Sequence, residues 1–371
     1  MVPLLDTTEF ESLFLSDEIL IDVRSPGEFE HARLPNSSNS PLLTNGERAV
    51  VGTEFRHHGQ AKAIELGHQL VNGQVKAERI DSWLALIREQ NVRALFCARG
   101  GLRSEIAQRW LREAGVSLPR VEGGYKALRR SLMDSFSSFI QDAHILVVSG
   151  QTGTGKTRFL LDGSHRCEAI DLEGLAMHCG SSFGGLFGVQ PTQATFENSL
   201  FVRAIKAQHS TQASRRMILI EDESRKIGQL SLPKALFQRI TDAPRVVLEL
   251  PMEQRIDIIK QDYVVNIIAR RAPSERTAAF DGLQISLMSA LKRLTKRLGD
   301  QRTKKALSLV VEAIAAHRDR EDLSLHDAWI ELLLREYYDP SYSRQLDARG
   351  QTIIGRGTVA DLLQQPHLFQ S

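Results

Sequence analysis

The feature that most limits how this chain can fold is a glycine-rich octapeptide that directly follows a short apolar run. Residues 150–157 read GQTGTGKT and match the pattern G-x-x-x-x-G-K-[ST], and residues 144–148 before them read HILVV. Between a strand and a helix, the backbone N–H groups of such a loop surround a di- or triphosphate. The pattern therefore predicts a parallel α/β layer in which this loop follows a buried strand.

Side chains of this loop have separate expected tasks. Lys156 would neutralise the outer oxygens of the phosphate group, and the Thr157 hydroxyl would reach a Mg²⁺ ion. The expected phosphate- and diphosphate-binding residues of the loop are Gly150, Thr152, Gly153, Thr154, Gly155, Lys156 and Thr157. A loop of this type binds polyphosphate, and its presence leaves nucleotide hydrolysis open.

An acidic partner of the loop is expected at the end of a neighbouring strand. The apolar run MILI at 217–220 ends in three acids, Glu221, Asp222 and Glu223. We choose Asp222 over the two glutamates as the acid of the phosphate site. A solvated strand end is the alternative interpretation of the triplet.

A second strand–loop–helix pattern surrounds a cysteine. The apolar residues 94–96 precede Cys97, which opens CARGGLRS, and apolar residues three or four apart then predict a helix as far as Gly115. The loop N–H groups, the helix start, Arg99 and Arg103 should together lower the thiol pKa and leave a thiolate nucleophile. An inert, buried cysteine is the alternative.

Upstream of this loop, the run ILIDV at 19–23 predicts another buried strand and continues into DVRSPGEF at 22–29. The order and separation of this stretch and the cysteine loop resemble the rhodanese (sulfurtransferase) domain. In that family the loop cysteine, here Cys97, carries a transferable chalcogen as a persulfide. Cys97 to Arg103 also reads C-x5-R, the loop of cysteine phosphatases. Both chemistries need a thiolate and an anion cradle, so the loop alone leaves them open.

Charge is unevenly distributed along the chain. The formal net charge is +2, yet residues 255–305 hold twelve Lys and Arg against five Asp and Glu, a local net charge of +7. In this segment Leu291, Leu294 and Leu298 share one helix face. The basic residues that lie to the other side, and that could bind RNA or DNA phosphates, are Lys292, Arg293, Lys296 and Arg297. An ordinary solvated helix surface is the alternative.

Several protein classes are excluded by composition. Three cysteines in 371 residues cannot form a disulfide framework, and their odd number favours reduced thiols in a cytoplasmic compartment. No run approaches the ~20 apolar residues of a membrane span, and the N-terminus lacks a signal-peptide pattern. The residues considered as zinc ligands are His165, Cys167, His178 and Cys179. Because they include no C-x2-C pair, we expect no such metal centre and no membrane partner.

These patterns predict an α/β protein of three consecutive parts. A rhodanese-like parallel-sheet domain is expected over 10–137, and a P-loop NTPase-like α/β domain over 143–252. Residues 253–371 should form a mainly helical, basic region, in which we find no further convincing buried strand. The oligomeric state cannot be inferred from these patterns.

Longer strings extend the resemblance to nearly the whole chain. These are VEGGYKAL at 121–128, DLEGLA at 171–176, EDESRKIG at 221–228 and YYDP at 337–340. With the two loops, they resemble the bacterial tRNA 2-selenouridine synthase family from about residue 10 to the YYDP segment. One departure is Cys179, where a basic residue is expected in His-x-Gly-Ser; this change could weaken a phosphate or RNA contact.

The resemblance implies a specific function. Members of the family act on the wobble uridine (position 34) of certain tRNAs and replace the sulfur of 2-thiouridine with selenium. They do so by S-geranylation from geranyl diphosphate, followed by selenium transfer from selenophosphate. Cys97 would then handle the selenium, with a perselenide as one form, and residues 150–157 would hold the diphosphate. The +7 segment would face tRNA, with Lys126, Arg129 and Arg130 as additions.

Two other functions remain open at this stage. One is a rhodanese-fold cysteine phosphatase or sulfurtransferase coupled to a P-loop ATPase, which would use Cys97 without any tRNA. The other is a non-catalytic RNA-binding adaptor, for which the thiol would be dispensable. The tRNA-modifying transferase is favoured because it uses both anion-binding loops and the basic segment.

Overall fold

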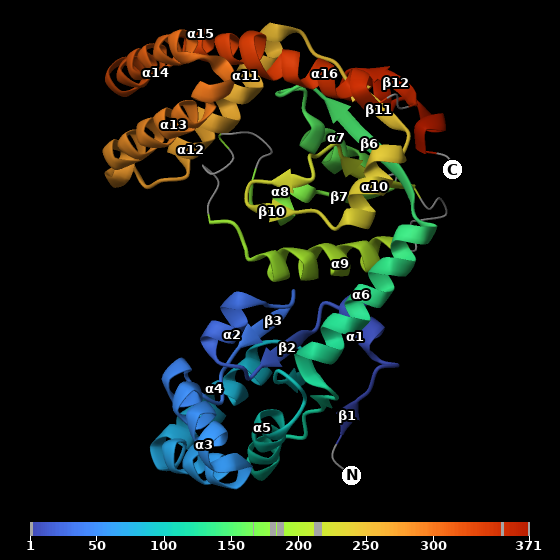
Figure 1. The fold of residues 1–371 in the computed structure, drawn as a ribbon, viewed down its shortest axis with the longest axis vertical. Coiled ribbons are helices and arrows are strands. Elements are labelled where there is room, and N and C mark those ends of the chain that lie inside the picture. The colour runs from blue at the N-terminus through green and yellow to red at the C-terminus, as the bar shows by residue number, and fades with distance from the viewer. Residues whose placement is uncertain are drawn as a thin grey trace. The chain divides into compact units, whose positions relative to one another are not determined.

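The computed structural model describes residues 3–165, 167–178, 183, 189–210, 217–349 and 352–369. Packing divides the chain into two compact units (Figure 1). The first unit comprises Met1–Gln141 together with Thr192–His209, and the second comprises Asp142–Pro191 together with Ser210–Ser371. The chain therefore returns to the first unit for one helix before it completes the second.

The first unit contains a sheet of five strands in the order β1-β5-β4-β2-β3, and every described pair in it is parallel. Its strands are β1 (Leu4–Leu5), β2 (Ile19–Asp22), β3 (Ser37–Asn39), β4 (Val92–Phe96) and β5 (Arg120–Val121). Its helices are α1 (Phe10–Leu15), α2 (Pro26–His31), α3 (Asn45–Leu70), α4 (Gly73–Glu89), α5 (Leu102–Glu113), α6 (Gly124–Asp142) and α9 (Gln193–His209). The strands and helix predicted around Cys97 are confirmed.

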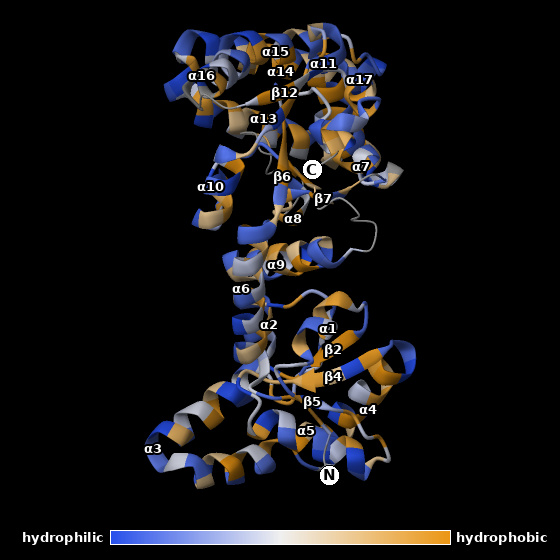
Figure 2. Ribbon diagram, turned by 90° about the vertical axis from the view of Figure 1, so that its right-hand side faces the viewer, coloured by the Kyte–Doolittle hydropathy of each residue, from blue (hydrophilic) through white to orange (hydrophobic). Residues whose placement is uncertain are grey.

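The core of the first unit lies between its central strands and its covering helices. Figure 2 shows β2 and β4 as hydrophobic, as expected for parallel strands covered on both faces. The fully buried Trp83 stacks on Trp110 at a centroid distance of 6.2 Å and donates from Nε1 to the Ser40 carbonyl at 2.9 Å. Cys97 is a member of the same buried cluster. The cysteine loop therefore starts from a packed and rigid part of the sheet.

Helix α9 belongs to the first unit although it follows β7 of the second in the chain. Its side chains Phe196 and Leu200 are fully buried. Asn198 on this helix accepts from Arg129 at 2.6 Å and donates to the Arg33 carbonyl at 2.8 Å. Boundaries drawn along the sequence cannot reveal such a return of the chain.

The second unit contains a sheet in the order β12-β11-β6-β8-β7, again parallel in every described pair, and an antiparallel pair β10-β9. Its strands are β6 (His144–Gly150), β7 (Glu168–Ile170), β8 (Met217–Glu221), β9 (Lys226–Ile227), β10 (Leu230–Ser231), β11 (Arg245–Leu248) and β12 (Ile353–Gly357). The α-helices beside this sheet are α7 (Lys156–Gly163), α8 (Leu172–Leu175), α10 (Lys234–Asp242) and α17 (Val359–Leu363), and a short 3-10 helix follows, η5 (Pro366–Phe369). The expected α/β class with two parallel sheets is confirmed.

The region after residue 252 is mainly helical, as expected. It contains α11 (Met252–Lys260), η2 (Gln261–Val265), α12 (Asn266–Ala269), η3 (Pro273–Glu275), α13 (Arg276–Leu298), α14 (Asp300–Arg320), α15 (His326–Leu333), η4 (Leu334–Tyr338) and α16 (Asp339–Arg349). Leu291, Leu294 and Leu298 are buried in its core, so the predicted apolar helix face is confirmed. In the described part of the chain, no helix is both long enough and apolar enough to span a bilayer.

One strand was not expected after residue 252. Strand β12 pairs with β11 and extends the sheet at its edge. Its five residues are half-buried or exposed and include Gly355 and Gly357. An edge strand of this composition lacks the continuous apolar run that identifies a buried parallel strand, which explains why the sequence pattern did not predict it.

Candidate functional site

The Cys97 thiol lies where β4 ends and the loop to α5 begins. The residue is 3% exposed, and its Sγ is 3.2 Å from the Ser104 hydroxyl and 3.8 Å from the Gly101 carbonyl oxygen. Ser104 is fully buried in the first turn of α5 and also donates to Gly101 at 2.9 Å. Because a hydroxyl carries one hydrogen, Ser104 accepts from the Cys97 thiol in this arrangement and holds the sulfur in place. The loop pattern C-x5-R does not include Ser104, so the motif alone does not predict this contact.

The start of α6 holds the backbone of this loop in place. The N–H of Tyr125 donates to the Cys97 carbonyl at 2.8 Å, and the N–H of Lys126 donates to the Ala98 carbonyl at 3.1 Å. Gly100 and Gly124 have φ angles of +65° and +57°, and a Cβ on Gly124 would collide with the Cys97 carbonyl. Glycine is therefore required at both positions. The string at 121–128 thus supports the cysteine loop.

The two arginines of the loop have different surroundings. Arg99 is exposed. Arg103 donates from Nη1 to Glu28 Oε2 at 2.6 Å and from Nη2 to Glu28 Oε1 at 3.0 Å. Although burial opposes the charge of Arg103, its pairing with Glu28 raises the Arg103 pKa. Burial likewise opposes the charge of Glu28, but the Arg103 guanidinium lowers the Glu28 pKa to about 2.

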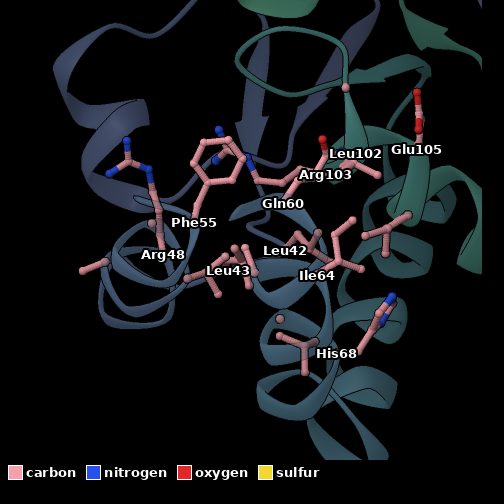
Figure 3. A pocket seen from close by; sticks show the side chains of 18 of the residues that line it. Leu42, Leu43, Arg48, Phe55, Gln60, Ile64, His68, Leu102, Arg103 and Glu105 are labelled. Atoms are coloured by element: carbon pink, nitrogen blue, oxygen red, sulfur yellow. The ribbon is translucent and has the colours of Figure 1, made fainter. Parts of the chain in front are cut away.

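A cavity of about 910 Å³ borders the cysteine loop in the first unit (Figure 3). Its wall includes Gly101, Leu102 and Arg103 of the loop and a long stretch of α3. Apolar side chains from several elements line it, including Leu43, Val51, Phe55, Ile64, Ile106 and Trp110. Both the volume and the lining are those of a small-molecule site.

The phosphate loop lies between β6 and α7 of the second unit, as predicted. Lys156 is the first residue of α7, and its Nζ folds back to the Gly150 carbonyl at 3.4 Å. Thr154 is almost fully buried and donates to the Gln151 carbonyl at 2.8 Å. Gly150, Thr152, Gly153, Thr154 and Gly155 lie together in this turn. Hydrogen bonds within the loop, including the one from Lys156, therefore connect its end to its beginning.

Glu221, rather than Asp222, is the acid beside Thr157. Oε1 of Glu221 accepts from the Thr157 hydroxyl at 3.3 Å, and Oε2 accepts from the backbone N–H of Glu173 at 3.1 Å. Asp222 instead accepts from Arg245 and from Ser149, both at 2.7 Å. Alternate residues of a strand point to opposite faces of the sheet, which explains why these two neighbours have different partners.

Glu221 and Glu223 have unusual electrostatic surroundings. Burial raises the pKa of Glu221 to about 8, and the nearby carboxylates of Glu173 and Asp171 add to the shift. Burial and Glu173 also raise the pKa of Glu223. Lys156 opposes both shifts. A cation bound in this region would favour the charged carboxylates.

A buried arginine from the helical region supports the phosphate loop. Arg255, which is 2% exposed, donates to the Thr152 carbonyl at 2.9 Å and to Gln151 Oε1 at 2.8 Å. It also donates to Asp339 through both terminal nitrogens, at 3.0 and 2.6 Å. Asp339 belongs to the YYDP segment. The YYDP string itself carries no signal for the contact with Arg255, because the two partners are far apart in the chain.

The four basic residues predicted to contact nucleic acid lie along α13. Lys292, Arg293, Lys296 and Arg297 are all exposed, on the side opposite the buried leucines. Arg297 donates to the Tyr337 hydroxyl at 3.0 Å. The helix therefore presents a continuous basic face to solvent.

The residues considered as zinc ligands are only partly described. Cys167 is buried, with its Sγ 3.8 Å from the Gly163 carbonyl oxygen, and Cys179 lies outside the described residues. Within the ranges that the structure describes, no group of three or more His, Cys, Asp or Glu side chains is placed to hold a metal ion.

Comparison with known proteins identifies two matching family models and close relatives. The family model described as tRNA 2-selenouridine synthase AAA domain matches residues 143–368, and the one described as Rhodanese-like domain matches residues 6–131. Proteins named tRNA 2-selenouridine synthase align over nearly their whole length. The one from Marinobacter nauticus is 44% identical over 95% of both chains. The one from Aeromonas salmonicida is 45% identical over 95% of this chain and 93% of its own length. The one from Pseudomonas fluorescens is 43% identical over 97% of this chain and 98% of its own length.

Proposed function

The chain belongs to the tRNA 2-selenouridine synthase family, as its motifs predicted, and we propose that it converts wobble 2-thiouridine in tRNA to 2-selenouridine in two steps. The first step is S-geranylation from geranyl diphosphate, and the second is selenium transfer from selenophosphate. The observation that carries the proposal is the presence of two different anion-binding loops in one chain, the Cys97 loop and the loop at 150–157. Each loop serves one step.

In the first step, the sulfur of 2-thiouridine attacks C1 of geranyl diphosphate. The S–C bond forms while the C–O bond breaks, the diphosphate leaves with the electron pair, and N3 of the base gives up its proton. The N–H groups of residues 150–157 and Lys156 bind the diphosphate, where negative charge develops on the leaving oxygen. Arg255 keeps this loop in shape through its contacts with Gln151 and Thr152.

A Mg²⁺ ion fits the donor atoms next to this loop. The Thr157 hydroxyl and the buried Glu221 carboxylate are 3.3 Å apart, and both are oxygen ligands. Mg²⁺ commonly takes one or two protein oxygens and completes its shell with substrate phosphates and water. When bound, the ion supplies positive charge that stabilises the leaving diphosphate. We assign the acidic ligand to Glu221 instead of Asp222, because Asp222 already accepts hydrogen bonds from Arg245 and Ser149.

In the second step, a selenium nucleophile replaces the geranylthio group. Direct exchange would have to expel a poor leaving group from C2, whereas the S-alkylated base releases a neutral thiol. Selenium adds to C2, the C2–S bond breaks with its electron pair on sulfur, and the geranylthiolate takes up a proton. Water then cleaves the Se–P bond and releases phosphate. Cys97 handles the selenium donor, and Ser104 holds the Cys97 side chain in position.

The basic face of α13 gives the tRNA a place to bind. Lys292, Arg293, Lys296 and Arg297 are exposed and can contact backbone phosphates without reading sequence. Recognition of the wobble base itself must come from residues near the reacting groups.

Mass spectrometry of tRNA treated with each donor separately tests the proposal. Purified protein and geranyl diphosphate should add a C10 group to tRNA that contains 2-thiouridine. Addition of selenophosphate should then replace that group with selenium. The same tRNA without the 2-thio group is the matched control and should gain no mass. No change of mass with either donor would exclude the proposed function, and Cys97-dependent release of phosphate from an aryl phosphate would instead support a cysteine phosphatase.

A further inference from the structure

We propose that the cavity between α3 and the Cys97 loop binds the ten-carbon prenyl chain of the S-geranylated uridine during selenium transfer. This inference rests on the proposed function and adds to it a site for the leaving group. The cavity has a volume of about 910 Å³ and lies entirely within the first unit. Its residues are shown in Figure 3.

The position of the cavity relative to Cys97 is the first reason for this assignment. Gly101, Leu102 and Arg103 form part of its wall, and the Gly101 carbonyl oxygen is 3.8 Å from the Cys97 sulfur. The reacting C2 atom must lie close to the selenium that this loop handles. The prenyl chain is attached to the sulfur on that same carbon, so the chain must lie beside the loop whichever site attached it.

The chemistry of the wall is the second reason. Phe55 and Leu102 line the cavity and remain 54% and 39% exposed. They come from two different elements, α3 and α5, and in Figure 3 they lie on the same cavity with Ile64. Exposed apolar side chains that meet around one cavity indicate a ligand with an apolar surface. A branched hydrocarbon chain has such a surface.

The polarity of the cavity is the third reason. Arg48 and Arg103 line it, and both form ion pairs with Glu28, at N–O distances of 3.0 and 2.6 Å. Because they share one carboxylate, the two cations lie at the same place, next to the cysteine loop. The remaining lining includes apolar side chains from α3 and α5, together with the polar side chains of Arg56, Gln60, His68 and Glu105. A ligand with a polar nucleotide at one end and a hydrocarbon chain at the other matches this arrangement.

Among the described residues, a cavity beside the phosphate loop is much smaller. Thr152, Tyr263, Trp329 and Tyr338 are among its lining residues, and its volume is about 20 Å³. A volume of this size holds about one water molecule. Of these two cavities, the one in the first unit is therefore the better fit for the prenyl chain during the second step.

The helix that forms much of the wall is suited to this task. α3 is 26 residues long, yet Ala63 is the one residue of this fully described helix that is buried. The backbone leaves helical geometry at Gly59, near the middle of the helix. Most of its apolar side chains are therefore not committed to the core. These apolar side chains remain available to contact a bound prenyl chain.

The test compares two anticodon stem-loop oligonucleotides that carry S-geranyl- or S-methyl-2-thiouridine. Each is incubated with selenophosphate, and selenation is followed by mass spectrometry. Ile64→Trp fills the cavity from α3, where Ile64 is half-buried. Val50→Trp is the matched control, because Val50 is on the same helix, is 51% exposed and does not line the cavity. The two leaving thiols differ little in acidity, so a rate difference reports contacts with the chain.

The wild-type protein should convert the geranyl substrate at least about tenfold faster, measured as kcat/KM, because each buried carbon contributes to binding. Ile64→Trp should bring the ratio of the geranyl to the methyl kcat/KM close to one, and an unchanged thermal unfolding midpoint shows that the variant is folded. Val50→Trp should behave as wild type. If Ile64→Trp kept the full geranyl preference, the assignment of the cavity would be overturned, whereas the proposed function would stand. A wild-type protein that converts neither substrate would overturn the proposed function and, with it, this inference.

Discussion

Arg103 of the cysteine loop donates two hydrogen bonds to Glu28 of α2, at 2.6 and 3.0 Å. This pair joins the two stretches on which the resemblance to a rhodanese domain depends, DVRSPGEF and CARGGLRS. It holds the side chain of Arg103 beside Cys97 and balances its charge. Glu28 also contacts Arg48 on the wall of the neighbouring cavity. One carboxylate therefore connects the thiol loop with the proposed prenyl site.

We predict that this ion pair makes the first unit sensitive to acid. The folded pKa of Glu28, about 2, is below its ordinary value of 4.5, so the pair stabilises the fold fully above about pH 4.5 and loses this effect as the pH falls towards about 2. The shift corresponds to at most about 3 kcal/mol. Glu28→Gln should lower the free energy of unfolding by up to that amount near neutral pH and by much less near pH 2.

Tryptophan fluorescence during urea unfolding measures this effect. Trp83 and Trp110 belong to the first unit and Trp329 to the second, so a Trp329→Phe background reports the first unit alone. Glu65→Gln is the control, because Glu65 forms an exposed pair with Lys62 on α3. Equal destabilisation by Glu28→Gln near neutral pH and near pH 2 would contradict the prediction.

Cys97→Ser should abolish selenation and leave S-geranylation intact. A serine hydroxyl is not ionised near neutral pH and cannot hold selenium in place of the cysteine sulfur. The geranylation step depends on the phosphate loop of the other unit and does not use the thiol. Mass spectrometry should therefore detect geranylated tRNA that does not proceed further. Cys167→Ser, another buried thiol, is the control and should keep both activities; normal selenation by Cys97→Ser would refute the role of the thiol.

Lys156→Ala should weaken the binding of geranyl diphosphate by about tenfold to a hundredfold. Hydrogen bonds to charged groups contribute about 1.5–3 kcal/mol, which corresponds to this range. Isothermal titration calorimetry measures the affinity. Arg158→Ala is a suitable control, because Arg158 is on the same helix, is exposed and contacts Asp162. Unchanged affinity in Lys156→Ala would count against the assignment of the loop.

Much of the fold and both loops could be predicted from the sequence because they depend on local patterns. Apolar runs of four or five residues identified β2, β4, β6 and β8, and glycine-rich turns after β4 and β6 identified the loops. Strand β12 could not be predicted in this way because it lies at an edge and carries little apolar signal. The packing of α9 in the first unit depends on contacts such as Arg129–Asn198, which span 69 residues.

The supporting residues of the site were harder to predict for a related physical reason. Arg255 reaches the phosphate loop across 103 residues, and only the tertiary fold brings the two together. The choice between Glu221 and Asp222 depends on which side of β8 faces Thr157, and an acidic triplet does not specify the face. Cys97 and Lys156, by contrast, stand in loops whose chemistry requires those residue types at those spacings.

Glu221→Gln and Asp222→Asn should have different effects. We expect Glu221→Gln to lose Mg²⁺-dependent binding of geranyl diphosphate with little loss of stability. Asp222→Asn should destabilise the second unit by about 3–5 kcal/mol, because it weakens the pairing of the fully buried Arg245. Calorimetric titration and thermal unfolding separate the two results. The reverse pattern would restore Asp222 as the acid of the phosphate site.

The Glu221 carboxyl also predicts a pH dependence of Mg²⁺-dependent donor binding. Its pKa is about 8, so the proton competes with the cation below that pH. Affinity for the Mg²⁺–geranyl diphosphate complex should therefore rise between about pH 6 and about pH 8 and then level off. Glu221→Gln should remove this rise, since its amide does not titrate. An equal rise in the variant would assign the pH dependence to another group.

Finally, the double variant Lys292→Ala/Lys296→Ala should weaken tRNA binding and reduce its salt dependence. Each phosphate contact that is lost lowers the slope of log K against log salt by about 1, so the slope should fall by about 2. Both lysines are exposed on α13, so the fold should not change. Lys62→Ala/Lys76→Ala removes the same charge from the first unit and is the control, measured by filter binding over a range of salt concentrations. Equal slopes in the wild type and the α13 variant would show that this face does not contact tRNA.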